Sequence, residues 1–244
     1  MVSFPEDRRV VALDLLAAQP QSEESNFDVS FDGLADLVAE FAAAIGLTDY
    51  VLLGHSHGGA LALRLATMRP DLLNALVLLC PAHPFSGYSE PVVRFYLSPV
   101  GARFARLAPR LPRRVQRFGM ERMTGPGKRL SRAQVERYRS VLLRNGAIAR
   151  VLRLLSSWQS DMRNLREALL GTPICLPALL IWGDRDSVVP LASAPNLVAH
   201  LTEWELCTIA GAGHLLADEV PANCGALIRT WLISRDSRED DQRG

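Results

Sequence analysis

The chain has 244 residues, of which 48% are hydrophobic, and its formal net charge is +1. This length predicts one domain, or one domain with an insertion, with enough apolar residues for a sizeable core. A net charge near zero argues against binding of nucleic acid or another polyanion by the protein as a whole.

The compartment is indicated by the cysteines and by the apolar runs. The four cysteines are widely spaced and match no metal-ligand pattern, so we expect reduced core thiols, no metal and a cytoplasmic protein. They are Cys80, Cys175, Cys207 and Cys224. The first residues lack the apolar centre of a signal peptide, and no apolar run reaches the roughly 18 residues of a membrane span.

Strand-like and helix-like runs alternate along most of the chain, which predicts an α/β fold with a mostly parallel sheet flanked by helices. The expected strands are Arg9–Leu15, Tyr50–Leu53, Leu76–Leu79, Leu179–Trp182 and Glu205–Ile209. The expected helices are Asp32–Ile45, a run from Ala60 to Arg69, Leu191–His200 interrupted by Pro195, and Cys224–Ile233. The charged end predicts a disordered tail over 237–244.

Residues 86–172 break this alternation, because they contain helix-like runs and no convincing strand. We expect a helical cap inserted over the sheet edge. Residues 91–155 hold 16 Lys and Arg against two acids, a net charge of about +14. Such a segment could attract an anionic substrate or membrane surface, and the Phe, Leu and Arg interleaved over 95–118 suit an interfacial helix. We favour a solvated helix face.

The hexapeptide Gly54-His55-Ser56-His57-Gly58-Gly59 lies between an apolar run and a helix-like run. A strand, a sharp turn and a helix raise a serine hydroxyl above the sheet edge, and glycines at 54 and 58 would relieve crowding in the strained turn. A glycine-rich turn around an ordinary serine is the alternative. The flanking pattern and the partners below favour Ser56 as a nucleophile.

A nucleophilic serine needs a base and an orienting carboxylate. His214, in a glycine-rich loop after the last predicted strand, belongs at the same sheet edge and is the expected base. Trp182-Gly183-Asp184-Arg185-Asp186 follows another strand, and position alone leaves both aspartates open.

The other histidines have weaker assignments. His55 and His57 flank the serine in a tight turn, so their side chains are expected to shape the pocket or its packing. His83, after the third expected strand, is expected to line the pocket. His200 ends a helix, where a partial positive charge is favourable.

These three motifs, in the order Ser, Asp, His, resemble those of the α/β-hydrolase superfamily. The resemblance covers about residues 9–83 and 176–235. It implies a discontinuous core of residues 1–85 and 173–236, with 86–172 in the place of the family's variable cap. The family's Gly-x-x-Asp pattern selects Asp186 as the acid. The backbone N–H of His57 would be one oxyanion donor.

The resemblance further implies acyl transfer to Ser56, hydrolysis by water, a small-molecule substrate and no cofactor. Serine in place of aspartate points away from the haloalkane dehalogenase and epoxide hydrolase branches. Esterases, lactonases, carbon–carbon bond hydrolases and cofactor-free haloperoxidase-like members all stay open.

The N-terminus departs from the family, which usually opens with strands and a loop that supplies a second oxyanion donor. Residues 1–8 contain no such loop, so we expect that Met1 is not the ancestral start. The strands at 9–15 and 50–53 would then pair directly or leave a gap with unpaired backbone. The sequence leaves the oligomeric state open, although an uncovered sheet edge would favour dimers or aggregation. The competing hypothesis is a catalytically impaired relative that binds a ligand or partner.

Overall fold

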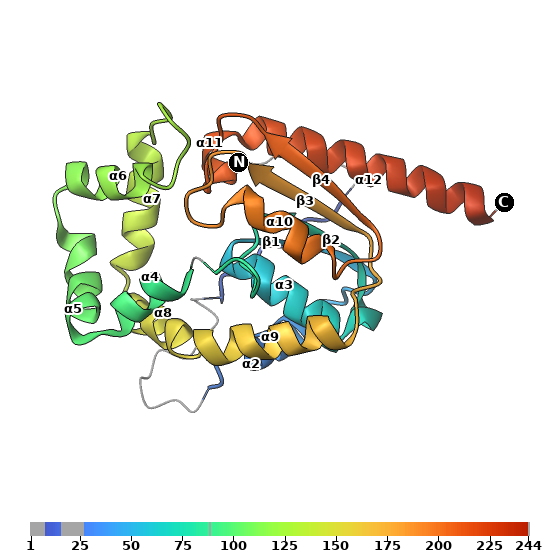
Figure 1. Ribbon diagram of the computed structural model, residues 1–244, viewed down its shortest axis with the longest axis horizontal. Coiled ribbons are helices and arrows are strands. Elements are labelled where there is room, and N and C mark those ends of the chain that lie inside the picture. The colour runs from blue at the N-terminus through green and yellow to red at the C-terminus, as the bar shows by residue number, and fades with distance from the viewer. Residues whose placement is uncertain (1–7, 16–26, 88, 244) are drawn as a thin grey trace.

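The computed structural model describes residues 8–15, 27–87 and 89–243. Within these residues a parallel sheet has the strand order β1-β2-β3-β4 (Figure 1). The strands are β1 (Tyr50–His55), β2 (Leu73–Leu79), β3 (Ala178–Gly183) and β4 (Trp204–Ile209). The central strands β2 and β3 are runs of Leu, Val, Ile and Ala because both of their faces are covered. Four of the five predicted strands are thereby confirmed.

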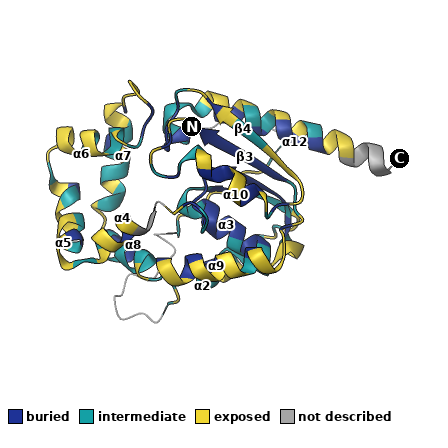
Figure 2. Ribbon diagram, viewed as in Figure 1, coloured by how far each residue is buried: buried dark blue, intermediate teal, exposed yellow. Residues whose placement is uncertain are grey.

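Helices cover both faces of the sheet. On one face lie α2 (Phe31–Ala44), α3 (His57–Met68) and α9 (Trp158–Gly171), and α12 (Pro221–Arg243) packs against the other (Figure 1). The buried residues gather on the central strands β2 and β3 and on the inward sides of these helices (Figure 2). Short elements complete the core: η1 (Pro70–Leu72), η3 (Leu191–Ser193), α10 (Ala194–Val198) and α11 (Leu216–Glu219). Pro195 lies in the first turn of α10, so it begins a helix instead of interrupting one.

The segment between β2 and β3 is helical throughout its described regular elements. It contains α4 (Ser89–Leu97), α5 (Pro99–Leu107), η2 (Ala108–Arg110), α6 (Arg113–Glu121), α7 (Arg132–Leu142), α8 (Ala147–Ser156) and α9. The helices from α4 to α8 extend to one side of the sheet (Figure 1). The last helix, α9, instead packs on α3, with Leu165 and Leu169 fully buried in the main core. The boundary between core and cap therefore lies nearer to residue 157 than to 172.

The strand predicted at Arg9–Leu15 is wrong. This segment forms no ladder with any described strand, and Val10 and Val11 are 54% and 38% exposed. An apolar run becomes a strand only where a neighbour pairs with its backbone. The segment is held by side chains instead, through an ion pair of Arg8 with Asp236 and a bond from Arg9 to the Ile45 carbonyl. The expectation that residues 1–8 lack an oxyanion loop concerns a segment of which only Arg8 lies within the described residues.

The disordered tail predicted over 237–244 is also wrong, because α12 continues to Arg243. Side-chain contacts are described as far as Arg238. The guanidinium of Arg235 lies 5.2 Å from the centre of the Trp231 ring, and Arg238 donates to the Ser234 carbonyl one turn earlier.

Across the described residues, every helix is too short or too polar to cross a bilayer.

Candidate active site

Ser56 occupies the turn between β1 and α3, with backbone angles φ 52° and ψ −115°. A positive φ is strained for a residue other than glycine, so surrounding contacts must hold the turn. The Ser56 N–H donates to the Leu79 carbonyl at 3.0 Å, and the Ser56 carbonyl accepts from the Ala82 N–H at 3.0 Å. Leu79 ends β2 and Ala82 lies in the loop after it, so the end of this strand and its loop fix the serine.

Two glycines make this turn possible. A Cβ on Gly54 would lie 2.3 Å from the Gly58 carbonyl oxygen, and one on Gly59 would lie 2.6 Å from the Cβ of Pro81. Gly58 has open space at its Cβ position. The crowded pair is therefore Gly54 and Gly59, and the steric role predicted for Gly58 is wrong. The sequence could not reveal this, because Pro81 comes from another strand end.

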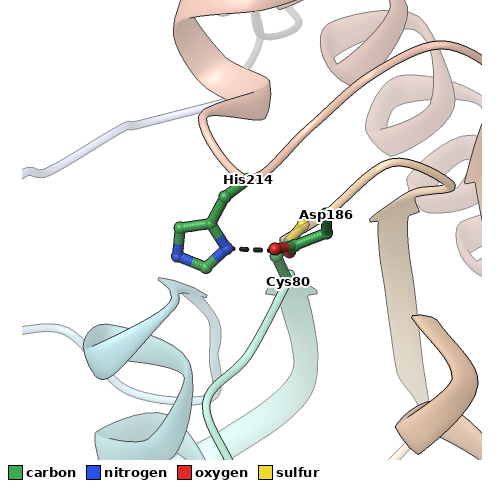
Figure 3. Close-up of side chains that lie close together, drawn as sticks. All are labelled: Cys80, Asp186 and His214. Carbon is green, nitrogen blue, oxygen red and sulfur yellow. Dashed lines mark hydrogen bonds and ion pairs between the residues drawn. The ribbon is translucent and has the colours of Figure 1, made fainter. Parts of the chain in front are cut away.

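The structure brings Ser56, His214 and Asp186 into one hydrogen-bonded chain. The Ser56 Oγ lies 2.8 Å from His214 Nε2, and His214 Nδ1 lies 2.8 Å from Asp186 Oδ2. Figure 3 shows the His214–Asp186 bond between two loops that follow β4 and β3. With Nδ1 donating to the carboxylate, Nε2 is free to accept the serine proton.

Asp186 is held in its charged form. Burial alone would raise the pKa of this carboxyl, but its hydrogen bonds outweigh burial and lower the pKa below the usual value. One oxygen accepts from His214, and the other accepts from the N–H groups of Val188 and Val189 at 2.8 and 2.9 Å. Asp186 is thus a buried, ionised and fixed partner for the imidazole.

Asp184 has a different position. Its Oδ1 accepts from the Gly211 N–H at 2.7 Å, so it braces the loop that carries His214 without touching the ring. The structure therefore separates the two aspartates that position in the sequence left open.

His55 and His57 both turn away from the serine hydroxyl. His55 Nε2 lies 2.7 Å from the His214 carbonyl oxygen, and this bond fixes the backbone of His214. The His57 ring is stacked on Trp158, 5.7 Å between centres, and meets Phe31 edge-on. Desolvation by burial lowers the pKa of each histidine to about 4, so both are neutral at pH 7. The backbone N–H of His57 begins α3, where helix geometry provides no acceptor.

His83 and His200 lie in the packing beside the sheet. His83 is 1% exposed, and its Nε2 lies 3.0 Å from Ser193 Oγ. The Ser193 hydroxyl donates to the Pro190 carbonyl, so it accepts from His83, which is then protonated on Nε2. His200 stacks on Phe85 with centres 4.5 Å apart. No described hydrogen bond joins either ring to Ser56, Asp186 or His214.

Glu219 is a positioning residue that the motifs did not reveal. Its carboxylate accepts from the N–H groups of Gly213 at 2.9 Å and Leu215 at 3.0 Å, on both sides of His214. The same carboxylate accepts from the Gly125 N–H of the cap at 2.8 Å. An acid five residues after a glycine-rich histidine loop was the available signal.

Cys80 lies behind the acid–base pair, and its thiol, the Asp186 carboxylate and the His214 ring place ligand atoms within 4.8 Å of one another (Figure 3). Burial raises the pKa of the thiol, which therefore stays protonated. Both oxygens of Asp186 accept internal hydrogen bonds. The cluster is thus an acid–base pair with a neutral thiol packed against it.

Comparison with known proteins agrees with the fold. A family model described as the alpha/beta hydrolase fold matches residues 2–221, so the chain belongs to this family and is an α/β-fold hydrolase. The expected fold class and family are confirmed.

Individual relatives are distant. The chain is 25% identical over 219 residues to the uncharacterized hydrolase YugF of Bacillus subtilis, with 87% of this chain and 76% of that protein covered. It is 28% identical over 241 residues to haloalkane dehalogenase 2 of Mycobacterium tuberculosis, covering 93% and 80%. The crystal structure of Cfl2 from Burkholderia cenocepacia matches with a TM-score of 0.74 at 19% identity, over 85% of this chain and 74% of that one.

Proposed function

We propose that this hydrolase cleaves ester-like bonds of small molecules through a covalent acyl-enzyme on Ser56. The observation that supports the proposal best is the continuous chain from Ser56 Oγ through His214 to Asp186, with 2.8 Å at each link. A hydroxyl with this base attached is the arrangement that acyl transfer requires.

The residues would act in two steps. Ser56 Oγ attacks the carbonyl carbon while its proton passes to His214 Nε2, and the charged oxygen points to the His57 N–H. Collapse of the intermediate expels the alcohol, which takes the proton from His214. Water then attacks the acyl carbon while His214 Nε2 takes its proton. The bond to Ser56 Oγ breaks, Oγ takes the proton back from His214, and the acyl group leaves as a carboxylic acid. Asp186 holds the imidazole in the required tautomer and stabilises its charged form.

The identity of the nucleophile argues against the reaction named for the dehalogenase relative. Displacement of halide by a carboxylate gives an ester that water can open, whereas displacement by a serine hydroxyl would give an ether that it cannot. Since Ser56 stands in the turn, acyl transfer fits this chain better than attack on an alkyl carbon. The reaction as proposed needs no cofactor.

We further propose a cytoplasmic location, because all four cysteines are free. They are not all core thiols: Cys80 and Cys224 are buried, Cys207 is partly exposed and Cys175 is exposed. An exposed free thiol is best preserved in a reducing compartment.

A panel of p-nitrophenyl esters of increasing acyl length tests the proposed function. The wild-type chain should hydrolyse short members, and Ser56→Ala should lose about 10⁴-fold or more of kcat. Ser160→Ala, which removes an exposed hydroxyl of α9, is the matched control and should keep full activity. Ester hydrolysis that persists in Ser56→Ala would overturn the proposal. Folded wild-type protein without activity on any ester would favour a binding role.

A further inference from the structure

A cavity of about 390 Å³ lies in the cap, away from the serine. Its walls come from α5, η2 and the turn between α7 and α8, and they include Arg106, Arg110 and Arg144. No acidic residue belongs to the described lining. One of these arginines is paired with a carboxylate that does not line the cavity: Arg144 Nη1 lies 3.2 Å from Asp14 Oδ2. The cavity therefore presents strong positive charge.

Beside the cavity wall lies a buried cation, Arg150. It is 8% exposed, and its Nε and Nη1 atoms are buried with no hydrogen-bond partner. It forms no ion pair with any residue that the structure describes. Its Nη1 lies 2.9 Å from the position of a Cβ on Gly146, which lines the cavity. An unpaired buried guanidinium is costly, so its neighbourhood is suited to an anion.

The N-terminus of α8 opens into the same cavity. This ten-residue helix begins after Gly146, which has a φ of 71° and offers no side-chain cap. Ile148 and Ala149 line the cavity and belong to the first turn, where the N–H groups have no intrahelical acceptor. Free N–H groups and the positive end of the helix dipole favour an anion there.

Hydrogen bonds hold the opposite wall in place. Gln116 Nε2 donates to the Pro109 carbonyl at 2.8 Å, and Arg139 Nε donates to the same carbonyl at 3.2 Å. Arg110 donates to the Arg106 carbonyl at 3.0 Å. The arginines of this wall are therefore carried on a braced turn rather than on a free loop.

We propose that this cap cavity binds a phosphoryl group, held by the α8 N-terminus, the rim arginines Arg106, Arg110 and Arg144, and the buried cation Arg150. Several guanidinium groups and a helix N-terminus suit an anion of charge near −2 better than a single carboxylate. The volume leaves room for a group attached to the phosphate. The site lies outside the Ser56–His214–Asp186 chain and does not depend on the reaction proposed for it.

Two sources share this chemistry: a soluble phosphate ester and a phospholipid headgroup. Val100, Phe104 and Leu107 recur at helical spacing on α5 and are 72%, 45% and 53% exposed, next to Arg106. This apolar stripe would suit lipid beside a headgroup. The experiment must therefore offer both sources.

Thermal unfolding of the whole chain at constant ionic strength tests the site, with 10 mM inorganic phosphate exchanged for chloride. At a tenfold excess over Kd, the wild-type Tm should rise by about 3 to 6 °C. Arg150→Met should show no rise, and in chloride it should be at least as stable as the wild type because an unpaired buried charge is gone. Arg163→Gln, which removes an exposed charge of α9, should respond like the wild type.

If Arg150→Met does not fold, the double variant Arg106→Gln, Arg110→Gln replaces it, because both side chains are exposed. Sedimentation with vesicles of phosphatidylglycerol in phosphatidylcholine separates the sources. Vesicle binding lost in the variants assigns a lipid headgroup, and a phosphate response without vesicle binding assigns a soluble ester. A wild-type Tm that phosphate leaves unchanged, or a rise of equal size in the variants, would overturn the site.

Discussion

The loops at the strand ends and the helices of the cap differ in how their side chains are held and how far they are exposed. Ser56 is held by backbone hydrogen bonds to Leu79 and Ala82, and Asp186 accepts hydrogen bonds from the Val188 N–H and from His214. The cap has short helices that expose large apolar side chains such as Val100 and Phe118, 72% and 64% exposed. The candidate site therefore depends mainly on the core, while most of the cap presents charged and apolar side chains to the surface.

One cap segment joins the two regions. The His214 N–H donates to the Met123 carbonyl at 2.7 Å, and Ser187 Oγ donates to the Arg122 carbonyl at 3.0 Å. With the bond from Gly125 to Glu219, these contacts connect residues 122–125 to both the base loop and the acid loop. A displacement of the cap would therefore reach the proposed catalytic residues.

The largest expected effect is in the core. Asp186→Asn should lower kcat on a p-nitrophenyl ester by about 10⁴-fold, because an amide no longer fixes the imidazole tautomer. Asp184→Asn is the matched control, since the Asp184 carboxylate contacts the Gly211 N–H and Arg185 rather than the His214 ring. Circular dichroism should show both variants folded. Equal losses in the two variants would contradict the assignment of Asp186.

The joint between core and cap should have the next largest effect. A Cβ on Gly125 would lie 2.0 Å from the Gly211 carbonyl oxygen, so Gly125→Ala must shift the segment that supports His214. We expect kcat/KM to fall about 10- to 100-fold. Gly119→Ala, where a Cβ meets open space on α6, should leave kinetics unchanged. Wild-type kinetics in Gly125→Ala would show that core and cap act independently.

A smaller effect is expected on the pH dependence of folding stability, through the buried His83 of the core. Burial lowers the pKa of His83 from 6.5 to about 4, so the unfolded chain binds a proton that the folded chain does not between these values. Stability is therefore lost as the pH falls from about 6.5 towards 4. His83→Gln keeps a hydrogen-bond donor for Ser193. It should reduce the slope of the free energy of unfolding against pH by up to about 1.4 kcal/mol per pH unit. Urea unfolding at pH 7, 6 and 5 measures this slope for the wild type and for His83→Gln. Identical slopes in the two proteins would contradict the prediction.

The smallest effect is expected at the end of α12, which belongs to neither region. Removal of residues 237–244 leaves the contacts of Arg235 with Trp231 and of Arg8 with Asp236. The free energy of unfolding should change by less than about 0.5 kcal/mol in urea unfolding. A larger loss would show that the tail helix contributes to the fold.

The sequence was informative where local pattern and position determine the structure. The strands at 50–53 and 76–79 are confirmed, and these two apolar runs pair with each other as parallel neighbours in the sheet. Ser56 and His214 could be singled out because each follows such a run in a glycine-rich turn. The structure places Ser56 Oγ 2.8 Å from His214 Nε2, and their roles as nucleophile and base are proposals.

The sequence failed where partners come from distant segments. The run at 9–15 looked like a strand but pairs with no described strand. Glu219 and Gly125 belong to no motif, and the hydrogen bond between them spans 94 positions of the chain. Arg150 is one of 15 arginines between residues 91 and 155, and only packing distinguishes it as buried. Burial and long-range approach are set by tertiary structure, which periodicity does not encode.

Labelling with a fluorophosphonate probe, followed by peptide mass spectrometry, tests the nucleophile most directly. The account predicts one modified site at Ser56, lost in both Ser56→Ala and His214→Ala and kept in Cys80→Ala, since the buried thiol stays protonated. Labelling of folded protein at another residue, or labelling that survives Ser56→Ala, would contradict it.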